Sequence, residues 1–188
     1  VLAYLKETQK DALTHISHIR RVQHEDRMLL DESTVRNLEL LETAGGGERK
    51  HTLIYLLDHC RTAMGSRRLR RWMLAPLRRL DQIEQRLDQV SAFLMQVALT
   101  DKLRGVLSGI GDLERLIARI SMPVTHINDL LKLRESLAPL DEFKSILQQS
   151  SHDEIREVGE QFDALVDSWQ LLRDHVLPEP SKKVKEGG

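Results

Sequence analysis

Cysteine is almost absent from this sequence: Cys60 is the single one in 188 residues, so no disulfide can form within the chain. A chain without disulfides suits a reducing compartment. Eight histidines are present, but no CxxC or HExxH motif accompanies them, and zinc needs three or four ligands that converge. The composition therefore predicts no metal site and a cytoplasmic protein.

Long apolar runs are absent as well. The longest uninterrupted one, LIYLL at Leu53 to Leu57, is far shorter than the roughly 20 residues that a membrane-spanning helix needs. No signal peptide is recognisable in the sequence. We therefore expect no membrane partner.

Proline and glycine are sparse, with five and ten residues, which leaves few turns for a many-stranded sheet. Leu, Arg, Glu, Asp and Gln dominate instead, and these residues favour helix. The composition predicts an all-α, multihelical fold. Two segments leave room for a short strand pair near the N-terminus, THISHIRRVQ at 14–23 and NLELLET at 37–43.

Recognisable catalytic and nucleotide-binding motifs are also missing. The three glycines at 45–47 lead to Glu48, whereas a phosphate-binding loop needs a glycine followed by Lys and then Ser or Thr. No nucleophile elbow or triad context surrounds the serines, the histidines or Cys60. We therefore interpret AGGGERK as a flexible loop, and expect no catalytic residue, no cofactor site and no enzymatic activity in this chain.

What the sequence does contain is helical periodicity. Asp31, Asp81 and Thr125 are predicted N-caps, because their side chains can accept from free N–H groups of a first turn. Pro76 should end one helix, and Pro123 follows the end of another. The segments predicted as helices are ESTVRNLELLET, TLIYLLDHCRTA, GSRRLRRWMLA, the stretch from Asp81 to Val97, DLERLIARI, INDLLKLRESL, PLDEFKSILQQ and residues 153–176.

The last of these helices carries the most regular pattern. Its apolar positions follow one another at intervals of three and four residues, which predicts one long helix that coils against a long partner. That partner is either an earlier helix or lies in sequence outside this chain. A shorter run with the same spacing, Ile83, Leu87, Val90, Leu94 and Val97, predicts a second contact seam. The positions of the long seam are Ile155, Val158, Phe162, Leu165, Trp169, Leu172 and Val176.

A strip of arginines stands out in TAMGSRRLRRWMLAPL, because no acidic residue occurs between Arg61 and Leu80. On a helical wheel Trp72 lies with Leu69 on the apolar side, whereas the arginines lie opposite or flank it. Two interpretations remain open: the arginines contact DNA phosphates, or they form a solvated face with local salt bridges. The candidate contact residues are Arg67, Arg68, Arg70 and Arg71.

Several long motifs, in order, carry a family resemblance. TAMGSRRLRRWMLAPLRRLDQIEQRLDQV at 62–90 resembles the TxMGSRxLRRWLxxPL block and RLDxV helix of the MutS family of bacterial DNA mismatch repair proteins. YLKETQK, LLDESTVRNLEL and GDLERLIARI are similar to YLxxTQ, LDxxTxRNLEL and GDLERxxxRI of the same family, and PEPSKKVKEGG is similar to its PPxxxxxGG. The resemblance covers essentially the whole chain.

The resemblance implies the core and lever domain of such a protein, with a helical core subdomain at 1–150, an outgoing lever helix at 151–177 and a tail at 178–188 leading to the clamp. The implied role is mechanical coupling between the binding of mismatched duplex DNA and an ATPase domain. The family's base-reading residues and ATP-binding residues have no counterparts in this chain. ATP and Mg, mismatched DNA and a homodimeric state are implied for the parent protein. The alternatives are a DNA-backbone-binding module that uses the arginine face, and a helical interaction domain that docks a partner on the last helix.

Overall fold

The computed structural model describes residues 26–45, 47–122 and 126–177, and within these ranges the chain is helical without a strand ladder. The predicted all-α class is thereby confirmed. The helices are α2 (Glu32–Asn37), α3 (Leu53–Leu57), α4 (Ala63–Leu74), α5 (Leu80–Met95), α6 (Val97–Ser108), α7 (Leu113–Ile120), α8 (Ile127–Leu137), α9 (Leu140–Gln148), α10 (Asp153–Gln161) and α11 (Val166–His175).

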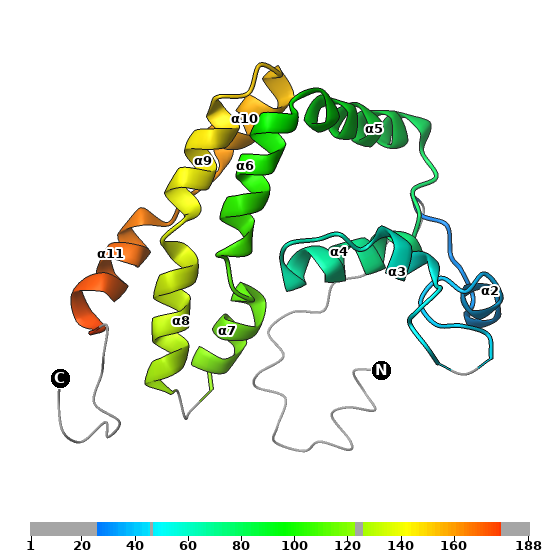
Figure 1. The fold of residues 1–188 in the computed structure, drawn as a ribbon, viewed down its shortest axis with the longest axis horizontal. Coiled ribbons are helices and arrows are strands. Elements are labelled where there is room, and N and C mark those ends of the chain that lie inside the picture. Colours follow the sequence, from blue (N-terminus) through cyan, green and yellow to red (C-terminus); the bar gives the residue numbers. More distant parts are fainter. Residues whose placement is uncertain (1–25, 46, 123–125, 178–188) are drawn as a thin grey trace, which may run out of the picture.

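The helices form two groups (Figure 1). In the first group α6 packs on α9, α10 packs on α9, α7 pairs with α8, and α11 lies along α8. In the second group α2, α3 and α4 lie together on the other side of the molecule. α5 runs from the top of α6 across to this second group, so it connects the two.

The first group is held by two apolar clusters. One cluster gathers Ala92, Leu103, Ile146, Leu147 and Ile155, which come from α5, α6, α9 and α10. Burying side chains of this size contributes roughly 1.5–3 kcal/mol each, which makes such a cluster the main source of stability.

The second cluster lies further along the same group. Its buried residues are Ile110, Leu137, Leu140 and Ala164, and Met64 of α4 packs against them from the second group. Phe143 and Phe162 join the two clusters through an edge-to-face contact with ring centroids 5.5 Å apart. The two clusters therefore form one continuous core.

The predicted strand pair is not formed in the part of the chain that the structure describes. An isolated antiparallel bridge joins Arg27 to Leu77 there, with the Met28 N–H donating to the Pro76 carbonyl at 2.8 Å. Residues 14–23 lie outside the described residues. Residues 38–43 form neither a strand nor a helix, because α2 ends at Asn37.

The first two predicted helices are shorter than expected. Asp31 caps α2 as predicted, since its carboxylate accepts from the Thr34 N–H at 2.6 Å. The helix then stops, because Glu39 adopts a left-handed conformation with φ 47°. α3 spans five residues instead of the predicted 52–63, and non-helical residues 58–62 separate it from α4.

Of the other two predicted N-caps, the one at Asp81 is wrong and the one at Thr125 falls outside the described residues. Asp81 is not an N-cap, because α5 starts one residue earlier and Asp81 pairs with Arg79 inside its first turn. Thr125 lies outside the described residues, and the structure places His126 at the N-cap of α8. The Asp112 start of the DLERLIARI helix is confirmed, with Asp112 as the cap of α7.

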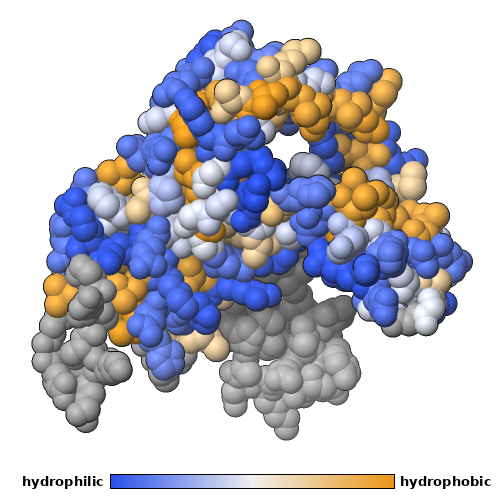
Figure 2. Space-filling model, in the orientation of Figure 1, coloured by the Kyte–Doolittle hydropathy of each residue, from blue (hydrophilic) through white to orange (hydrophobic). Residues whose placement is uncertain are grey.

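The seam predicted from Ile83 to Val97 does not form a contact in the described residues. The helix breaks at Gln96, where φ is −113° and ψ is 58°, and Val97 already belongs to α6. α5 packs its mixed polar face, centred on Gln89 and Ala92, against the rest of the chain. Its apolar stripe faces outward and forms the hydrophobic surface along the top of Figure 2. The exposed residues are Leu80, Leu87, Val90, Leu94 and Met95.

The single long helix predicted at 153–176 is also wrong, because residues 162–165 separate α10 from α11. Phe162 is extended and Leu165 is left-handed, with φ 51° and ψ 37°. The Leu165 N–H donates to the Asp163 carboxylate at 2.9 Å, which satisfies the broken backbone locally. The break inserts Phe162 and Ala164 into the second cluster, so the regular apolar spacing serves two partners, α9 and α8, in place of one.

The closest approach between α9 and α10 yields a stability prediction. A Cβ added at Gly159 would lie 2.8 Å from Leu147 Cβ and 3.0 Å from the Gln148 nitrogen, whereas a Cβ at Gly105 in α6 meets no atom within 4 Å. Gly159→Ala should therefore destabilise the protein by about 1–3 kcal/mol through overpacking. Gly105→Ala, the matched control, should stabilise it by about 0.5–1 kcal/mol. Urea unfolding of both variants measures this, and equal effects at the two positions would contradict the α9–α10 packing.

Candidate functional site: the arginine helix and its neighbours

The arginine strip folds as α4, which begins and ends as its sequence dictates. The Thr62 hydroxyl accepts from the Gly65 N–H at 3.0 Å, and the helix stops just before Pro76. Leu69 and Trp72 are half-buried, whereas Arg68, Arg70 and Arg71 are exposed. The predicted division of the helix into an apolar and a basic side is confirmed, with Arg67 as the exception.

Arg67 reaches across to the N-terminus of α7. Its guanidinium donates to both carboxylate oxygens of Asp112 at 2.7 Å and to Glu114 at 2.6 and 2.9 Å. Asp112 also caps α7, accepting from the Arg115 N–H at 3.2 Å. Hydrogen bonds from Arg67 lower the pKa of Asp112 to about 2, and the two carboxylates raise the pKa of Arg67. Arg67 is therefore an intramolecular tie.

The contacts of Arg67 with Asp112 and Glu114 close a ring made of α4, α5, α6 and α7, which we call the frame. The chain runs through α4, α5, α6 and α7 in order, and the Arg67 contacts join residues 45 and 47 positions apart, returning α7 to α4. Arg104 of α6 adds a second link by donating to the His59 carbonyl at 3.1 Å. Figure 2 shows an opening between α5 and α4 that the closed frame surrounds. The frame is held at α4 mostly by polar contacts, with Met64 as its apolar link.

Arg68 lies against an aromatic ring. Its Cζ atom is 5.3 Å from the centroid of Trp72, and Arg86 of α5 stacks more closely on the same ring, at 3.7 Å. The Trp72 Nε1 atom is buried and has no hydrogen-bond acceptor among the described residues. The tryptophan thus links α4 to α5 through arginine–aromatic contacts.

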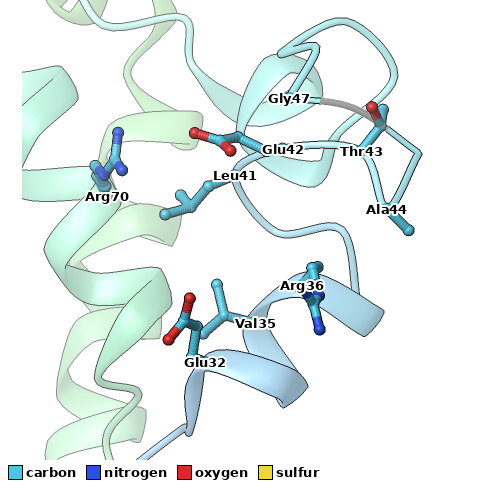
Figure 3. A pocket seen from close by; sticks show the side chains of 9 residues that line it. All are labelled: Glu32, Val35, Arg36, Leu41, Glu42, Thr43, Ala44, Gly47 and Arg70. Atoms are coloured by element: carbon cyan, nitrogen blue, oxygen red, sulfur yellow. The ribbon is translucent and has the colours of Figure 1, made fainter.

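Arg70 faces a different side, where two open pockets of about 460 and 260 Å³ adjoin. Figure 3 shows the larger one, between α2, the 41–47 loop and α4, with the Glu32 and Glu42 carboxylates on the same side as Arg70. The side chains that line this pocket carry both charge signs. Arg71 is exposed and makes no ion pair within the part of the chain that the structure describes. The four predicted arginines therefore lie in four different surroundings.

The predicted seam residues of the C-terminal helices are also divided. Ile155 and Val176 are buried, and Phe162, Trp169 and Leu172 pack half-buried against the two clusters. Val158 and Leu165 are exposed at 52% and 40%. Arg134 of α8 holds the end of α11 by donating to the Val176 carbonyl at 2.5 Å.

Residues 26–45, 47–122 and 126–177 contain neither a cluster of metal-ligating side chains nor a membrane-spanning helix. No group of three or more His, Cys, Asp or Glu side chains converges there. No helix in these ranges is long and apolar enough to cross a bilayer. Desolvation and the neighbouring Asp58 raise the pKa of the Cys60 thiol, which disfavours the reactive thiolate.

Sequence reasoning missed three functional partners, namely Asp112, Glu114 and Arg86. Asp112 and Glu114 were placed correctly at a helix start, but their partner is 45 or more residues away. No local pattern in one sequence indicates such a pairing. Arg86 directly precedes Leu87 of the predicted seam, and no motif in the sequence marks it as a partner of Trp72.

The Arg67 tie predicts a pH-dependent contribution to stability. The pKa of Asp112 is about 2 in the folded protein, against an ordinary value of 3.8. Its stabilising contribution is therefore complete above pH ~4 and is lost as the pH falls toward 2. We expect Arg67→Met to lower the melting temperature at pH 7 and to match the wild type near pH 2. Thermal unfolding across this range measures the difference.

Arg71→Met serves as the control, because Arg71 is exposed and unpaired among the described residues. It should change stability by about 0.5 kcal/mol or less at every pH. A constant difference between Arg67→Met and the wild type from pH 7 to pH 2 would contradict the tie.

Comparison with known proteins agrees with this geometry. Residues 33–188 match the family model for MutS domain III. The chain is 37% identical over 188 residues to the DNA mismatch repair protein MutS of Alkaliphilus oremlandii, covering 100% of this chain and 21% of that protein. It is 37% identical over 188 residues to the MutS of Clostridium novyi, again covering 100% of this chain and 21% of that protein. For the MutS of Bacillus subtilis the identity is 36% over 184 residues, covering 98% and 21%.

The match to the family model extends over most of the chain, including α4, α7 and the helices that carry both clusters. The chain spans about a fifth of the length of these curated relatives. It belongs to the MutS family of DNA mismatch repair proteins, of which it represents domain III.

Proposed function

We propose that this chain is the helical domain of a MutS-type mismatch repair protein that couples mismatched-DNA binding to an ATPase domain, both of which lie outside it. Family membership supports the repair role. On this proposal the parent protein is a cytoplasmic, homodimeric, DNA-dependent ATPase that binds ATP, Mg and mismatched duplex. The chain itself contributes mechanics and no chemistry.

The closed frame is the observation that carries this proposal. A displacement is transmitted between distant sites when the connecting element moves as a rigid body between discrete arrangements. The contacts of Arg67 support such a role for helices α4 to α7, because they return α4 to α7 and limit the hinge freedom that an open chain would have. The core of α8 to α11 extends the same body through shared apolar clusters.

The break between α10 and α11 refines the proposed lever. Each half is packed on its own core helix, α9 or α8, so residues 151–177 act as part of the body to which they are fixed. Exposed Val158 and Leu165 leave room on the outer side for further contacts. We therefore keep 151–177 as the lever segment and 178–188 as the tail of the domain, with 1–150 as its core, and assign the stiffness to the packing.

The alternative, a DNA-backbone-binding module, draws its support from Arg68, Arg70 and Arg71. These are exposed, and no carboxylate pairs with them within the described residues. Arg67 counts against the original four-residue face, because its donors are occupied by Asp112 and Glu114. Docking of a partner on the last helices is a weaker alternative, since α11 already packs on α8.

Opening the frame in the full-length protein tests the coupling. We expect Arg67→Met to leave the Kd for mismatched duplex and the Kd for ATP within about twofold, because neither site includes this residue. The factor by which duplex changes ATP affinity should fall toward one, from the 5- to 150-fold that is typical of coupled sites. Nucleotide titrations with and without mismatched duplex measure the factor.

Arg49→Met is the matched control, because Arg49 pairs with Asp58 inside the second group and closes no frame. Unchanged coupling in Arg67→Met, or an equal loss in Arg49→Met, would overturn the proposal. Saturable ATP hydrolysis by the isolated chain would overturn its purely mechanical role.

A further inference from the structure

Two guanidinium groups lie over the ring of Trp72, and a third arginine contacts the end of the same helix. Arg68 and Arg86 both lie over this ring, at 5.3 and 3.7 Å from the centroid. Arg27 joins them from the start of the described chain, donating at 2.9 Å to the carbonyl of Ala75, the C-cap of α4. We call these four residues the arginine–tryptophan cluster.

The cluster differs from the other clustered arginines in having no carboxylate. Elsewhere in the described residues, arginines that contact charged groups contact acids, and none of the ion pairs there includes Arg27, Arg68 or Arg86. The arginines with such partners are Arg49, Arg67, Arg79, Arg115, Arg119, Arg156 and Arg173.

Two consequences show that the cluster is incomplete. Burial, together with the charges of Arg27 and Arg68, lowers the pKa of Arg86, and no acid counters this effect. The buried Nε1–H of Trp72 lacks an acceptor among the described residues, although buried indole N–H groups usually have one. The cluster thus has unbalanced positive charge and an indole N–H without an acceptor. An oxyanion balances such charge, and its oxygens accept hydrogen bonds from guanidinium and indole donors alike.

We propose that the arginine–tryptophan cluster is a binding site for the carboxylate of an Asp or Glu side chain on another protein segment. The carboxylate would lie between Arg68 and Arg86 and accept hydrogen bonds from the edges of their guanidinium groups. Stacking on the ring uses the faces of these groups and leaves their edge donors available. The ligand class is thus an acidic peptide segment.

The depth of the cluster favours a side-chain carboxylate over a DNA phosphate. Arg27, Trp72 and Arg86 are half-buried, and the Trp72 Nε1 atom is covered. A carboxylate at the end of a flexible side chain can approach donors that are half-buried in this way. A backbone phosphate is held on the rigid surface of a duplex, where it meets exposed arginines such as Arg71 more readily.

The origin of the acidic segment follows from the proposed function, on which this step rests. If the chain transmits motion within a protein about five times its length, neighbouring domains must bind to its surface. Uncompensated charge is costly in the isolated domain and is tolerated where a partner completes it. α5 also exposes its apolar stripe beside Arg86, which gives a partner further surface to bury.

The fluorescence of Trp72 reports on the site directly. The chain has two tryptophans, so Trp169→Phe leaves Trp72 as the single emitter. We expect a hexaglutamate peptide to change this emission saturably at low salt, whereas hexaglutamine does not. Arg68→Gln with Arg86→Gln should weaken hexaglutamate binding by at least about tenfold, because charge-assisted hydrogen bonds are lost.

Arg49→Gln with Arg156→Gln is the control, since it removes the same net charge from arginines that already have carboxylate partners. Equal responses to both peptides, or equal affinities in both double variants, would overturn the proposal. So would a tighter response to duplex DNA at equal charge concentration that is lost in the Arg68/Arg86 variant, because it would assign the site to phosphate. Neither outcome bears on coupling, which is measured separately through Arg67.

Thermal stability provides a second readout that requires no ligand. Arg86→Met keeps the ring covered and removes the charge that Arg27 and Arg68 repel. Its melting temperature should exceed that of the wild type at low salt by about 2–4 °C, and the difference should shrink as salt screens the repulsion. A lower melting temperature at every salt concentration would show that Arg86 is a structural residue and would overturn the proposal.

Discussion

The arrangement of the N-terminal helices depends on a single guanidinium. Arg67 binds Asp112 and Glu114 together, which fixes α4 to the start of α7. Apart from these ion pairs, α4 and the residues just before it are joined to the helical core by the packing of Met64 and by the Arg104 contact with the His59 carbonyl. The far end of α5 is anchored separately, because Ala92 is buried in the first apolar cluster. An exposed ion pair alone contributes little to stability, but a bidentate pair with a third acceptor also defines orientation.

The two halves of the molecule are therefore stabilised in different ways. Helices α6 and α8 to α11 share an apolar core, so their relative positions are set by close packing. In α4 and α5 the inward side chains include half-buried Trp72, Arg86 and Gln89, and Ala92 is the residue of these helices that is fully buried. The leucines at positions 80, 87 and 94 of α5 face outward. Both the uncompensated arginines and the exposed leucines lie on this polar half. The arginines without carboxylate partners and the exposed leucines thus occur where the helices are held by hydrogen bonds and ion pairs. Such contacts are easier to rearrange than an interdigitated apolar core.

The sequence predicted the helices where local chemistry decides them. Asp31 caps α2 as predicted, the helix predicted to start at Asp112 forms as α7, and α4 ends just before Pro76, because each effect operates within one turn. The cap predicted at Asp81 is wrong, because α5 begins at Leu80. The family resemblance gave the identity through ordered motifs. The sequence did not predict features that depend on which helix packs against which. The regular spacing from Ile155 to Val176 could not show that its first half packs on α9 and its second half on α8. It also could not show that Arg67 finds its acids on α7, because a wheel orders residues on one helix and contains no information about the next.

The location of the polar tie bears on how such a domain could transmit a change. An apolar core resists partial separation, since opening it exposes a contiguous surface to water. An ion pair between two helices can exchange carboxylate oxygens for water or for another acid at small net cost. A change between two discrete arrangements would therefore occur at the Arg67 contact, with α4 held to α7 in each arrangement and the core of α8 to α11 intact. An acidic partner at the arginine–tryptophan cluster would act on the same helix, at Arg68, the residue next to Arg67. Binding of the acidic partner at Arg68 would then be linked to the Arg67 contact with α7, because α4 carries both arginines.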